Sequence, residues 1–322
     1  MTRVAVLDDY QRRAAGYADW ASLGPGIDVE FFADPIAPEA LPAALASHEI
    51  VVAMRERTRF PRAVLASLPA LRLMVTTGMR NAAIDIAYLQ ERGVTVCGTD
   101  GSGAAPGPGV PSTAEVAWAL ILAVAKRITL EDRALRDGHW QLGLPVTLAG
   151  ATLGLAGLGT LGQAMIGPAR AFGMEVIAWS EHLTDQRAAA AGVRRVTLPE
   201  LLAQSDFLSI HLVLSERTRG LFAAAELAAM KPTAVLINTS RGPIVDETAL
   251  IAAVRDGTIA GAGLDVYEAE PLPAGHPLTA LPTAVLLPHL GYVNEPGFRH
   301  MYGQVVEDIA AFLSGNPIRT LP

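Results

Sequence analysis

The sequence TLGLAGLGTLG, Thr152–Gly162, decides the fold of this chain. A short apolar run leads into a turn of the form GxGxxG, and a helical pattern follows. Gly157 permits the tight turn, Gly159 lets the backbone approach a pyrophosphate, and Gly162 lets the helix pack close to the strand. In a chain with 30 glycines the motif alone is weak, and an ordinary strand–helix turn is the alternative. A second strand is predicted at Glu175–Trp179, so we expect a dinucleotide-binding unit.

Apolar runs alternate with amphipathic stretches on both sides of this segment. Before it, the runs are Val4–Leu7, Val29–Phe32, Ile50–Met54, Leu71–Val75 and Val94–Cys97. From the glycine motif onward they are Thr152–Ala156, Glu175–Trp179, Phe207–Val213, Ala234–Asn238, Ala260–Leu264 and Ala284–Leu287. Continuous apolar strands separated by helices are typical of a parallel sheet covered on both faces. The sequence therefore predicts an α/β fold with two Rossmann-like, doubly wound parallel-sheet domains and a cleft between them.

The alternation breaks at Gly101–Pro111, GSGAAPGPGVP, which holds four glycines and three prolines. This composition suits neither a helix nor a central strand, so we expect a linker or hinge loop there. Ser112 and Glu115 then have the spacing of a capping box. They stand in front of a predicted buried helix that includes Val116–Ala125.

The last predicted helix, Pro296–Leu313, belongs to a segment too short to form a domain, so we expect it to pack on the first domain. The substrate-binding domain is then discontinuous and consists of residues 1–101 and 291–322. Residues 102–290 form the predicted dinucleotide-binding domain.

Composition argues against several classes of protein. The chain has 322 residues and a net charge of −7, without a cluster of Lys or Arg, so nucleic acid and anionic membranes are not expected partners. Its most apolar stretch, Val116–Ala125, is about half of the roughly 20 residues that a membrane-spanning helix needs. Met1–Tyr10 holds two aspartates where a signal peptide would be apolar, and Cys97 is the single cysteine, so we expect a cytoplasmic protein. The histidines show no spacing typical of a metal site.

The residues after Glu175–Trp179 bear on the choice between NAD and NADP. An acid is expected about 20 positions after the glycine turn, where it would bind the adenosine ribose hydroxyls. Ser180 holds that position and would not repel a 2′-phosphate, whereas the carboxylate of Glu181 would. We predict NAD as the cofactor, with Ser180 beside the ribose and NADP as the alternative.

Three further segments place polar residues directly after predicted strands. They are INTSRGPIVD at Ile237–Asp246, GLDVYEAEP at Gly263–Pro271 and LPHLG at Leu287–Gly291. Together with the glycine motif, in this order and spacing, they resemble the D-isomer-specific 2-hydroxyacid dehydrogenase family, in particular its phosphoglycerate dehydrogenase-like branch. The resemblance covers nearly the whole chain. It implies an NAD(P)-dependent oxidoreductase that transfers a hydride between nicotinamide and a small 2-oxo acid or D-2-hydroxy acid.

The chemistry of these segments fits that reaction independently. Reduction of a 2-oxo acid needs a cation for the carboxylate and the developing alkoxide, and Arg241 offers a forked, permanently charged donor. His289 is a natural proton donor near neutral pH, and Glu270 can orient it and keep it charged. These are the predicted catalytic residues, and the matching family positions have these roles. Structural or surface positions are the alternative for each.

The resemblance also implies a set of cofactor contacts. Thr160 and Leu161 match positions at the pyrophosphate, Thr239 matches one beside the nicotinamide, and Asp265 matches one that holds the carboxamide. The implied cofactor-binding residues are Gly157, Gly159, Thr160, Leu161, Gly162, Ser180, Leu212, Val213, Thr218, Thr239, Arg241, Asp265 and His289.

The first domain should supply the other side of the substrate site. Gly78, Met79 and Arg80 lie in a segment that aligns with the family's carboxylate-binding loop, and Arg241 completes the predicted substrate contacts. Many members carry small apolar residues in that loop, so Arg80 is a departure that suits an acidic or phosphorylated substrate. The alternative is that Arg80 points to solvent or pairs with a structural acid. Arg55 ends another predicted strand of the same sheet and is a further candidate, with a surface ion pair as its alternative.

The family resemblance leaves other functions and the assembly open. In formate dehydrogenases the partner of the histidine is Gln, and Glu270 counts against that activity. A dinucleotide-sensing binding protein, like the C-terminal-binding-protein corepressors, shares the fold and keeps the three catalytic residues. The region around Trp140 often contributes to a dimer in relatives, so we expect a homodimer. The sequence does not name the 2-hydroxy acid.

Overall fold

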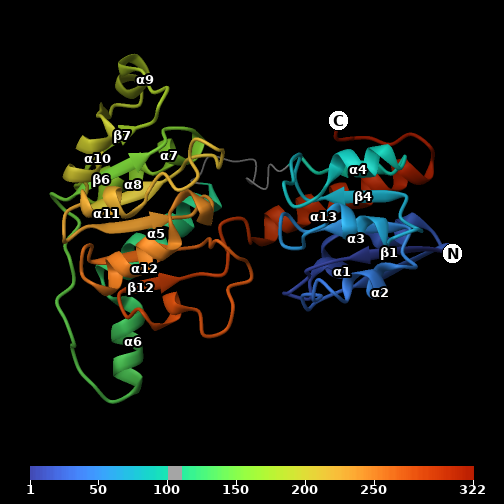
Figure 1. Ribbon diagram of the computed structural model, residues 1–322, viewed down its shortest axis with the longest axis horizontal. Coiled ribbons are helices and arrows are strands. Elements are labelled where there is room, and N and C mark those ends of the chain that lie inside the picture. Colours follow the sequence, from blue (N-terminus) through green and yellow to red (C-terminus); the bar gives the residue numbers. More distant parts are fainter. Residues whose placement is uncertain (101–110) are drawn as a thin grey trace. The chain divides into compact units, whose positions relative to one another are not determined.

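The computed structural model describes residues 1–100 and 111–322 (Figure 1). The predicted linker lies outside the described residues except for Pro111, as does the predicted boundary at residues 101–102. The chain divides into two compact units, Met1–Gly107 with Asn294–Pro322 and Pro108–Val293. The predicted α/β class with two parallel sheets is confirmed.

The first unit is built on a parallel five-stranded sheet in the order β2-β1-β3-β4-β5. The strands are β1 (Thr2–Val6), β2 (Ile27–Phe31), β3 (Ile50–Ala53), β4 (Leu73–Thr76) and β5 (Thr95–Gly98). Its helices are α1 (Ala14–Tyr17), η1 (Trp20–Leu23), α2 (Leu41–Leu45), α3 (Arg62–Ala66), α4 (Ile86–Glu91) and α13 (Glu295–Leu313). The central strands β3 and β4 are wholly buried, whereas the edge strand β2 alternates in burial. Helix α13 packs against α1, β4 and β5, so the last helix belongs to the first unit.

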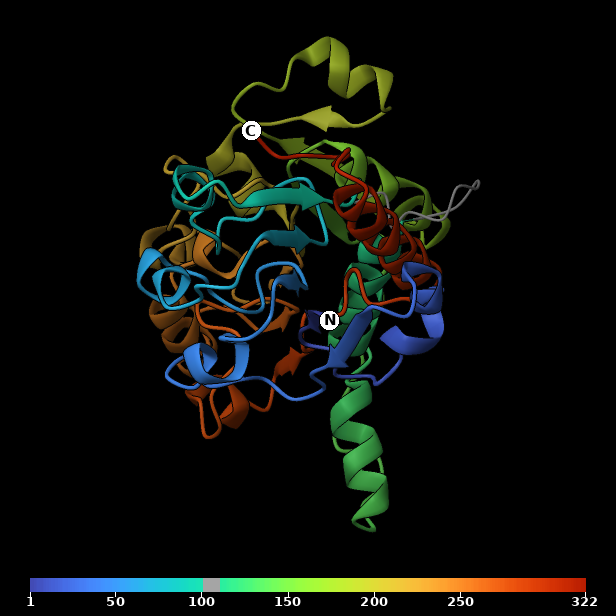
Figure 2. The same cartoon turned by 90° about the vertical axis from the view of Figure 1, so that its right-hand side faces the viewer.

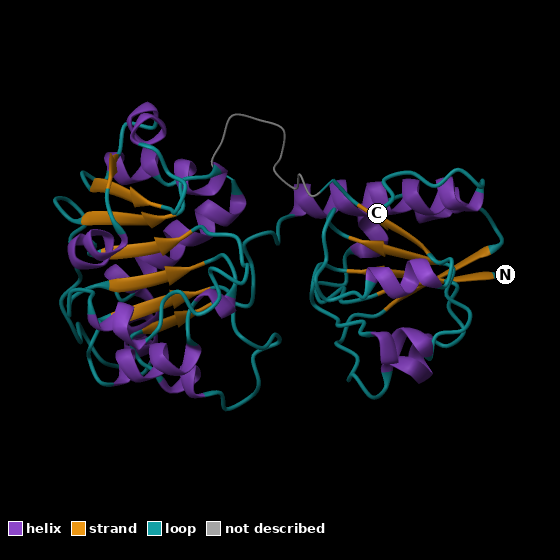
Figure 3. Cartoon of the chain, turned by 45° about the horizontal axis from the view of Figure 1, so that its top comes forward, coloured by secondary structure: helices purple, strands orange, loops and turns teal. Residues whose placement is uncertain are grey.

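The second unit is built on a parallel seven-stranded sheet in the order β12-β11-β10-β9-β6-β7-β8. The strands are β6 (Thr152–Ala156), β7 (Glu175–Trp179), β8 (Arg194–Arg195), β9 (Phe207–Ile210), β10 (Val235–Asn238), β11 (Gly261–Leu264) and β12 (Ala284–Leu286). Figure 3 shows helices on both faces of each sheet. Strand order reverses between β6 and β9, and ligands of such sheets bind where the loops at that point diverge.

The helices of the second unit agree with the predicted pattern in most places. They are α5 (Ser112–Ala125), α6 (Ile128–Arg136), α7 (Thr160–Ala164), α8 (Ile166–Ala171), α9 (Asp185–Ala190), α10 (Leu198–Gln204), α11 (Ala224–Ala228), η2 (Gly242–Ile244), α12 (Glu247–Arg255) and η3 (Pro277–Ala280). The helix after the glycine turn is interrupted at Met165. Pro168 has no N–H to donate to the carbonyl of Ala164, which removes one bond of the helical ladder.

The predicted capping box in front of α5 is wrong. Pro111 is the N-cap residue, and its carbonyl accepts hydrogen bonds from the N–H groups of Ala114 and Glu115. Ser112 therefore already lies in the first turn, where its side chain makes no capping bond. The apolar helix itself is confirmed, and it packs against β10, β11 and β12. Among the described residues, no helix is long and apolar enough to cross a membrane.

Candidate active site

The glycine turn after β6 has the shape that a dinucleotide needs. Gly157 has a φ of +106°, and a Cβ there would lie 2.4 Å from the carbonyl oxygen of His211. A Cβ on Gly162 would lie 2.1 Å from the oxygen of Gly157, so both positions require glycine. By contrast, no atom lies within 4 Å of a Cβ built on Gly159, the N-cap of α7. The turn is closely packed at Gly157 and Gly162 and open at Gly159, and this arrangement fits a bound pyrophosphate.

The neighbouring strands place the predicted adenosine contacts around this turn. The N–H of Gly157 donates to the carbonyl of Trp179 over 2.7 Å, and the N–H of His211 donates to the carbonyl of Ala156 over 2.8 Å. Ser180 follows the first of these strands, and Leu212 follows the second. Val213, the next residue along this loop, is 79% exposed. The predicted residues therefore lie on the two loops that flank the turn.

Glu270 and His289 form a hydrogen-bonded pair, with 2.6 Å between Glu270 Oε2 and His289 Nδ1. The second carboxylate oxygen, Oε1, accepts the N–H of Tyr267 over 3.0 Å. Burial raises the pKa of Glu270. His289, the Tyr267 amide and the charge of Arg241 lower this pKa by a larger amount, so that its net shift is downward. The side chains of His289 and Glu270 remain 22% and 28% exposed. A small molecule can thus reach an imidazole that is hydrogen-bonded to a carboxylate.

The loop that carries His289 is held by hydrogen bonds to the side chain of Asp265. His289 has a φ of +54°, in the left-handed region that non-glycine residues seldom adopt. The next two amides, of Leu290 and Gly291, donate to the two carboxylate oxygens of Asp265 over 2.6 and 2.9 Å. Burial raises the pKa of Asp265, and the two amides oppose that rise. Asp265 therefore fixes the histidine loop, and its implied contact with nicotinamide stays a prediction.

Arg241 is brought to the same edge of the sheet by close packing of two loops. A Cβ on Gly242 would lie 2.0 Å from the backbone carbon of Tyr267, so the loops after β10 and β11 touch directly. The Arg241 backbone is fixed by Asn238, whose Nδ2 donates to the Arg241 carbonyl over 3.0 Å. Arg241, Glu270 and His289 thus each follow a strand, as predicted, and the structure shows that these strands, β10, β11 and β12, are adjacent in the sheet. Sequence reasoning did not single out Gly242 or Tyr267, although both lie in the quoted motifs.

In the first unit, Arg55 and Gly78 lie together. Arg55 has a φ of +51°, and its N–H donates to Thr77 Oγ1 over 2.9 Å. A Cβ on Gly78 would lie 2.8 Å from Arg55 Nη1, so the guanidinium lies over the glycine. Met79 and Arg80 are exposed beside them. The predicted substrate residues of this unit therefore occupy one loop cluster at the carboxyl ends of β3 and β4.

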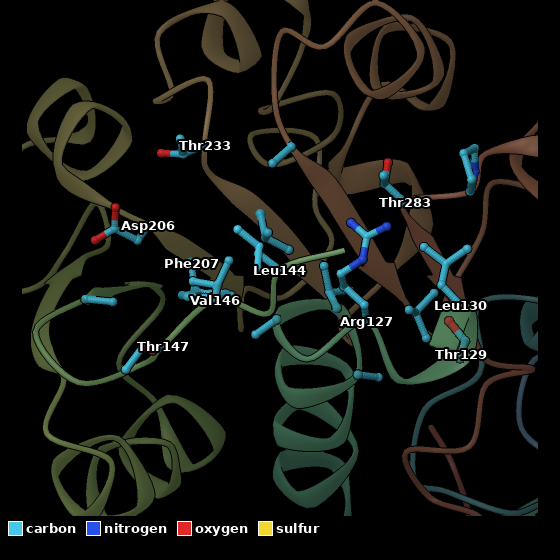
Figure 4. A pocket seen from close by; sticks show the side chains of 18 of the residues that line it. Arg127, Thr129, Leu130, Leu144, Val146, Thr147, Asp206, Phe207, Thr233 and Thr283 are labelled. Atoms are coloured by element: carbon cyan, nitrogen blue, oxygen red, sulfur yellow. The ribbon is translucent and has the colours of Figure 1, made fainter. Parts of the chain in front are cut away.

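A cavity of about 490 Å³ lies at the opposite edge of the second sheet (Figure 4). Its lining includes Phe207, Val235 and Thr283, which stand at the amino ends of β9, β10 and β12. Leu144 and Arg127 cover it from the segment around α6. Cofactors of doubly wound sheets bind at the carboxyl ends of the strands, so this cavity is not the dinucleotide site. No cluster of His, Cys, Asp and Glu suited to a metal ion occurs among the residues that the structure describes.

Comparison with known proteins agrees with this geometry. Residues 118–291 match the family model described as D-isomer specific 2-hydroxyacid dehydrogenase, NAD binding domain. The chain is 38% identical over 261 residues to the glyoxylate reductase of Aeropyrum pernix, covering 78% of this chain and 76% of that protein. It is 34% identical over 297 residues to the D-3-phosphoglycerate dehydrogenase of Mycobacterium leprae, covering 92% and 54%. The solved structure of a phosphoglycerate oxidoreductase from Vibrio cholerae superposes with a TM-score of 0.90 at 36% identity, covering 98% of this chain and 100% of that one.

Gly159 and Gly162 of the turn should respond differently to a methyl group. Gly159→Ala adds it to open space, so we expect unchanged thermal stability and NADH binding weakened at least about tenfold, because the pyrophosphate loses its close approach. Gly162→Ala forces the methyl against backbone, and we expect a loss of about 1–3 kcal/mol of unfolding free energy. Urea unfolding and NADH fluorescence titration measure the two effects. Tight NADH binding by Gly159→Ala would contradict the assignment of this turn.

Proposed function

The chain belongs to the D-isomer specific 2-hydroxyacid dehydrogenase family and is an NAD-dependent enzyme of that family, and we propose that Arg241, Glu270 and His289 catalyse its reaction. The observation that carries this proposal is the 2.6 Å contact between Glu270 and His289, beside Arg241, at the carboxyl edge of the sheet. When bound, NADH supplies the hydride for reduction of the 2-oxo acid, and NAD⁺ accepts it in the reverse direction.

Each of the three side chains has a distinct task in this proposal. Arg241 binds the substrate carboxylate with its fork and stabilises charge that develops on the carbonyl oxygen. His289 uses Nδ1 for Glu270, which leaves Nε2 to give a proton to that oxygen in reduction and to take it back in oxidation. Glu270 is ionised at neutral pH because its pKa is lowered, and its negative charge favours the imidazolium form.

The first unit supplies the remaining substrate contacts in this proposal. Backbone amides of Gly78 and Met79 bind the carboxylate, and Arg55 lies over Gly78 with its charge at the same loop. Arg80 adds a second exposed cation for an acidic or phosphorylated group at the far end of the substrate. The names of the relatives include both a glyoxylate reductase and a D-3-phosphoglycerate dehydrogenase. In this proposal, the charge of the loop distinguishes between substrates with and without a second anionic group.

The second unit also carries a surface suited to a homodimer. Figure 2 shows α6 projecting from its unit, and the segment that follows it displays Leu144 at 92% and Trp140 at 76% exposure. Glu131 holds this segment in place, since its carboxylate accepts the N–H groups of Leu142 and Gly143. Exposed apolar side chains on a fixed segment favour burial against a second copy of the chain.

We also propose that the protein is cytoplasmic. Its buried, unpaired Cys97 suits a reducing compartment, and fractionation of source cells would test the location.

The catalytic assignment predicts the behaviour of two variants on a panel of 2-oxo acids. We expect His289→Ala to lower kcat for reduction by roughly 100-fold or more, since general acid catalysis contributes 10²–10⁴. Glu270→Gln keeps a hydrogen bond but removes the charge that favours imidazolium. Reduction needs the protonated imidazole, so its decline with rising pH should begin at lower pH in this variant. Oxidation needs the neutral imidazole, so its rise should also begin at lower pH.

Two outcomes would contradict this assignment. An unchanged pH profile of Glu270→Gln, together with an inactive His289→Ala, would show that Glu270 is not the partner of His289. Binding of NADH without turnover of any 2-oxo acid by the wild-type protein would instead indicate a dinucleotide-sensing binding protein.

Substitutions of Arg55 and Arg80 in the first unit should weaken binding of different ends of the substrate. We expect Arg55→Met to raise KM for every 2-oxo acid at least about tenfold, because it removes a charge beside the carboxylate loop. Arg80→Met should raise KM only for substrates with a second anionic group, and NADH affinity should stay unchanged in both. Equal effects of Arg80→Met on monoanionic and dianionic substrates would remove Arg80 from the specificity site.

The dimer surface can be tested by its apolar side chains. We expect wild-type protein to sediment as a dimer in analytical ultracentrifugation and Trp140→Ser/Leu144→Ser to sediment as a folded monomer at micromolar concentration. Phe172→Ser serves as the control, because Phe172 is also exposed, at 42%, but lies after α8. A monomeric wild-type protein, or a double variant that remains dimeric, would contradict the proposed surface.

A further inference from the structure

An ion pair connects two loops beside the glycine turn. Arg217 Nη1 donates to Glu181 Oε2, and the same nitrogen lies 3.2 Å from Nε2 of His182. Glu181 and His182 follow β7, whereas Arg217 belongs to the loop after β9. The position of Glu181 in the sequence sets its carboxylate against a 2′-phosphate, but only the structure shows that Arg217 is its partner.

The sheet order places this pair over the adenosine side of the dinucleotide site. β7 and β9 are the two neighbours of β6, and each is tied to the end of β6 by a backbone hydrogen bond. The two loops therefore leave the sheet on either side of Gly157. In doubly wound folds the ribose hydroxyls of the adenosine lie at the end of the strand that corresponds to β7. Glu181 and Arg217 thus flank the place where a 2′-phosphate would be bound.

Hydrogen bonds fix the backbone around Arg217, whereas the side chain of this residue is accessible to solvent. Thr218 Oγ1 accepts the N–H of Ser215 over 2.8 Å and donates to the carbonyl of Val213 over 2.7 Å, which closes the turn around Arg217. The Arg217 side chain is 62% exposed, and that of Glu181 is 59% exposed. An ion pair this exposed contributes little to stability, so a ligand can replace either partner at low cost.

We propose that Arg217 is the residue that binds the 2′-phosphate of NADP, and that Glu181 competes for it and thereby sets the preference for NAD. NAD leaves the ion pair intact. NADP requires Arg217 to exchange the carboxylate for the 2′-phosphate, next to a carboxylate that repels it. This inference rests on the cofactor site proposed above and adds the residues that distinguish the two nucleotides.

The chemistry of the two anions supports an exchange in this direction. A phosphate dianion offers more acceptor oxygens and more charge than a carboxylate, and the guanidinium fork can bind it with two parallel hydrogen bonds. Ser180, the residue next to Glu181, carries no charge and leaves room at the ribose. Removal of the Glu181 charge should therefore both release Arg217 and end the repulsion.

Adenosine 2′,5′-bisphosphate and AMP test this without any catalytic step, because both lack nicotinamide. We would titrate each by calorimetry into the wild type, Glu181→Gln, Arg217→Met, the double variant and Glu175→Gln. The last is a matched control, since Glu175 begins the same strand at its opposite end. We expect Glu181→Gln to tighten bisphosphate binding at least about tenfold, the range of a charge-assisted hydrogen bond. In the double variant, Arg217→Met should remove most of that gain and leave only the part due to the lost repulsion, while AMP binding and Glu175→Gln stay near wild type.

The outcomes separate this inference from the cofactor site on which it rests. Unchanged bisphosphate binding by Glu181→Gln would overturn it, as would a gain that persists undiminished in the double variant, provided that AMP still binds. Failure of the wild type to bind either nucleotide would overturn the cofactor site itself. A parallel change in the ratio of kcat/KM for NADPH and NADH would extend the result to the reaction.

Discussion

Parallel pairing of β10, β11 and β12 requires the loops that follow these strands to leave the sheet at one edge, and the proposed catalytic site depends on this constraint. Arg241, Glu270 and His289 each come from a different one of these loops. The loops come close enough because Gly242 has no side chain where Tyr267 passes. A buried sheet thus fixes the positions, while the side chains proposed to touch the substrate remain partly exposed.

The buried Asp265 holds the loop that carries the partly exposed His289. Asp265 is wholly buried, and an unpaired carboxylate there would be costly. Two backbone amides satisfy it, and these amides belong to the residues directly after His289. The left-handed backbone of His289 is held by those bonds. The same contacts that make the buried charge tolerable therefore keep the imidazole in reach of Glu270.

The residues that we propose for specificity lie in different parts of the molecule from those that we propose for catalysis. The residues proposed to distinguish substrates, Arg55 and Arg80, belong to the first unit, and those proposed to distinguish NAD from NADP, Glu181 and Arg217, are exposed on loops of the second. Exposed side chains can change with little effect on the core, because their contribution to stability is small. This agrees with relatives that are named for different compounds, a glyoxylate reductase and a D-3-phosphoglycerate dehydrogenase, and with a solved structure that shares the fold of this chain.

The sequence by itself determined the parts of this protein that depend on local backbone geometry. Apolar runs and the spacing of Gly157, Gly159 and Gly162 predict strand, turn and helix, because each requirement involves neighbours along the chain. The capping box was predicted wrongly although it is also a local feature, since Pro111, one residue earlier, is the N-cap of α5. Contacts between loops were decided only by the tertiary structure. Arg217 lies 36 residues from Glu181, and they meet because β7 and β9 both flank β6, an order that no local pattern encodes.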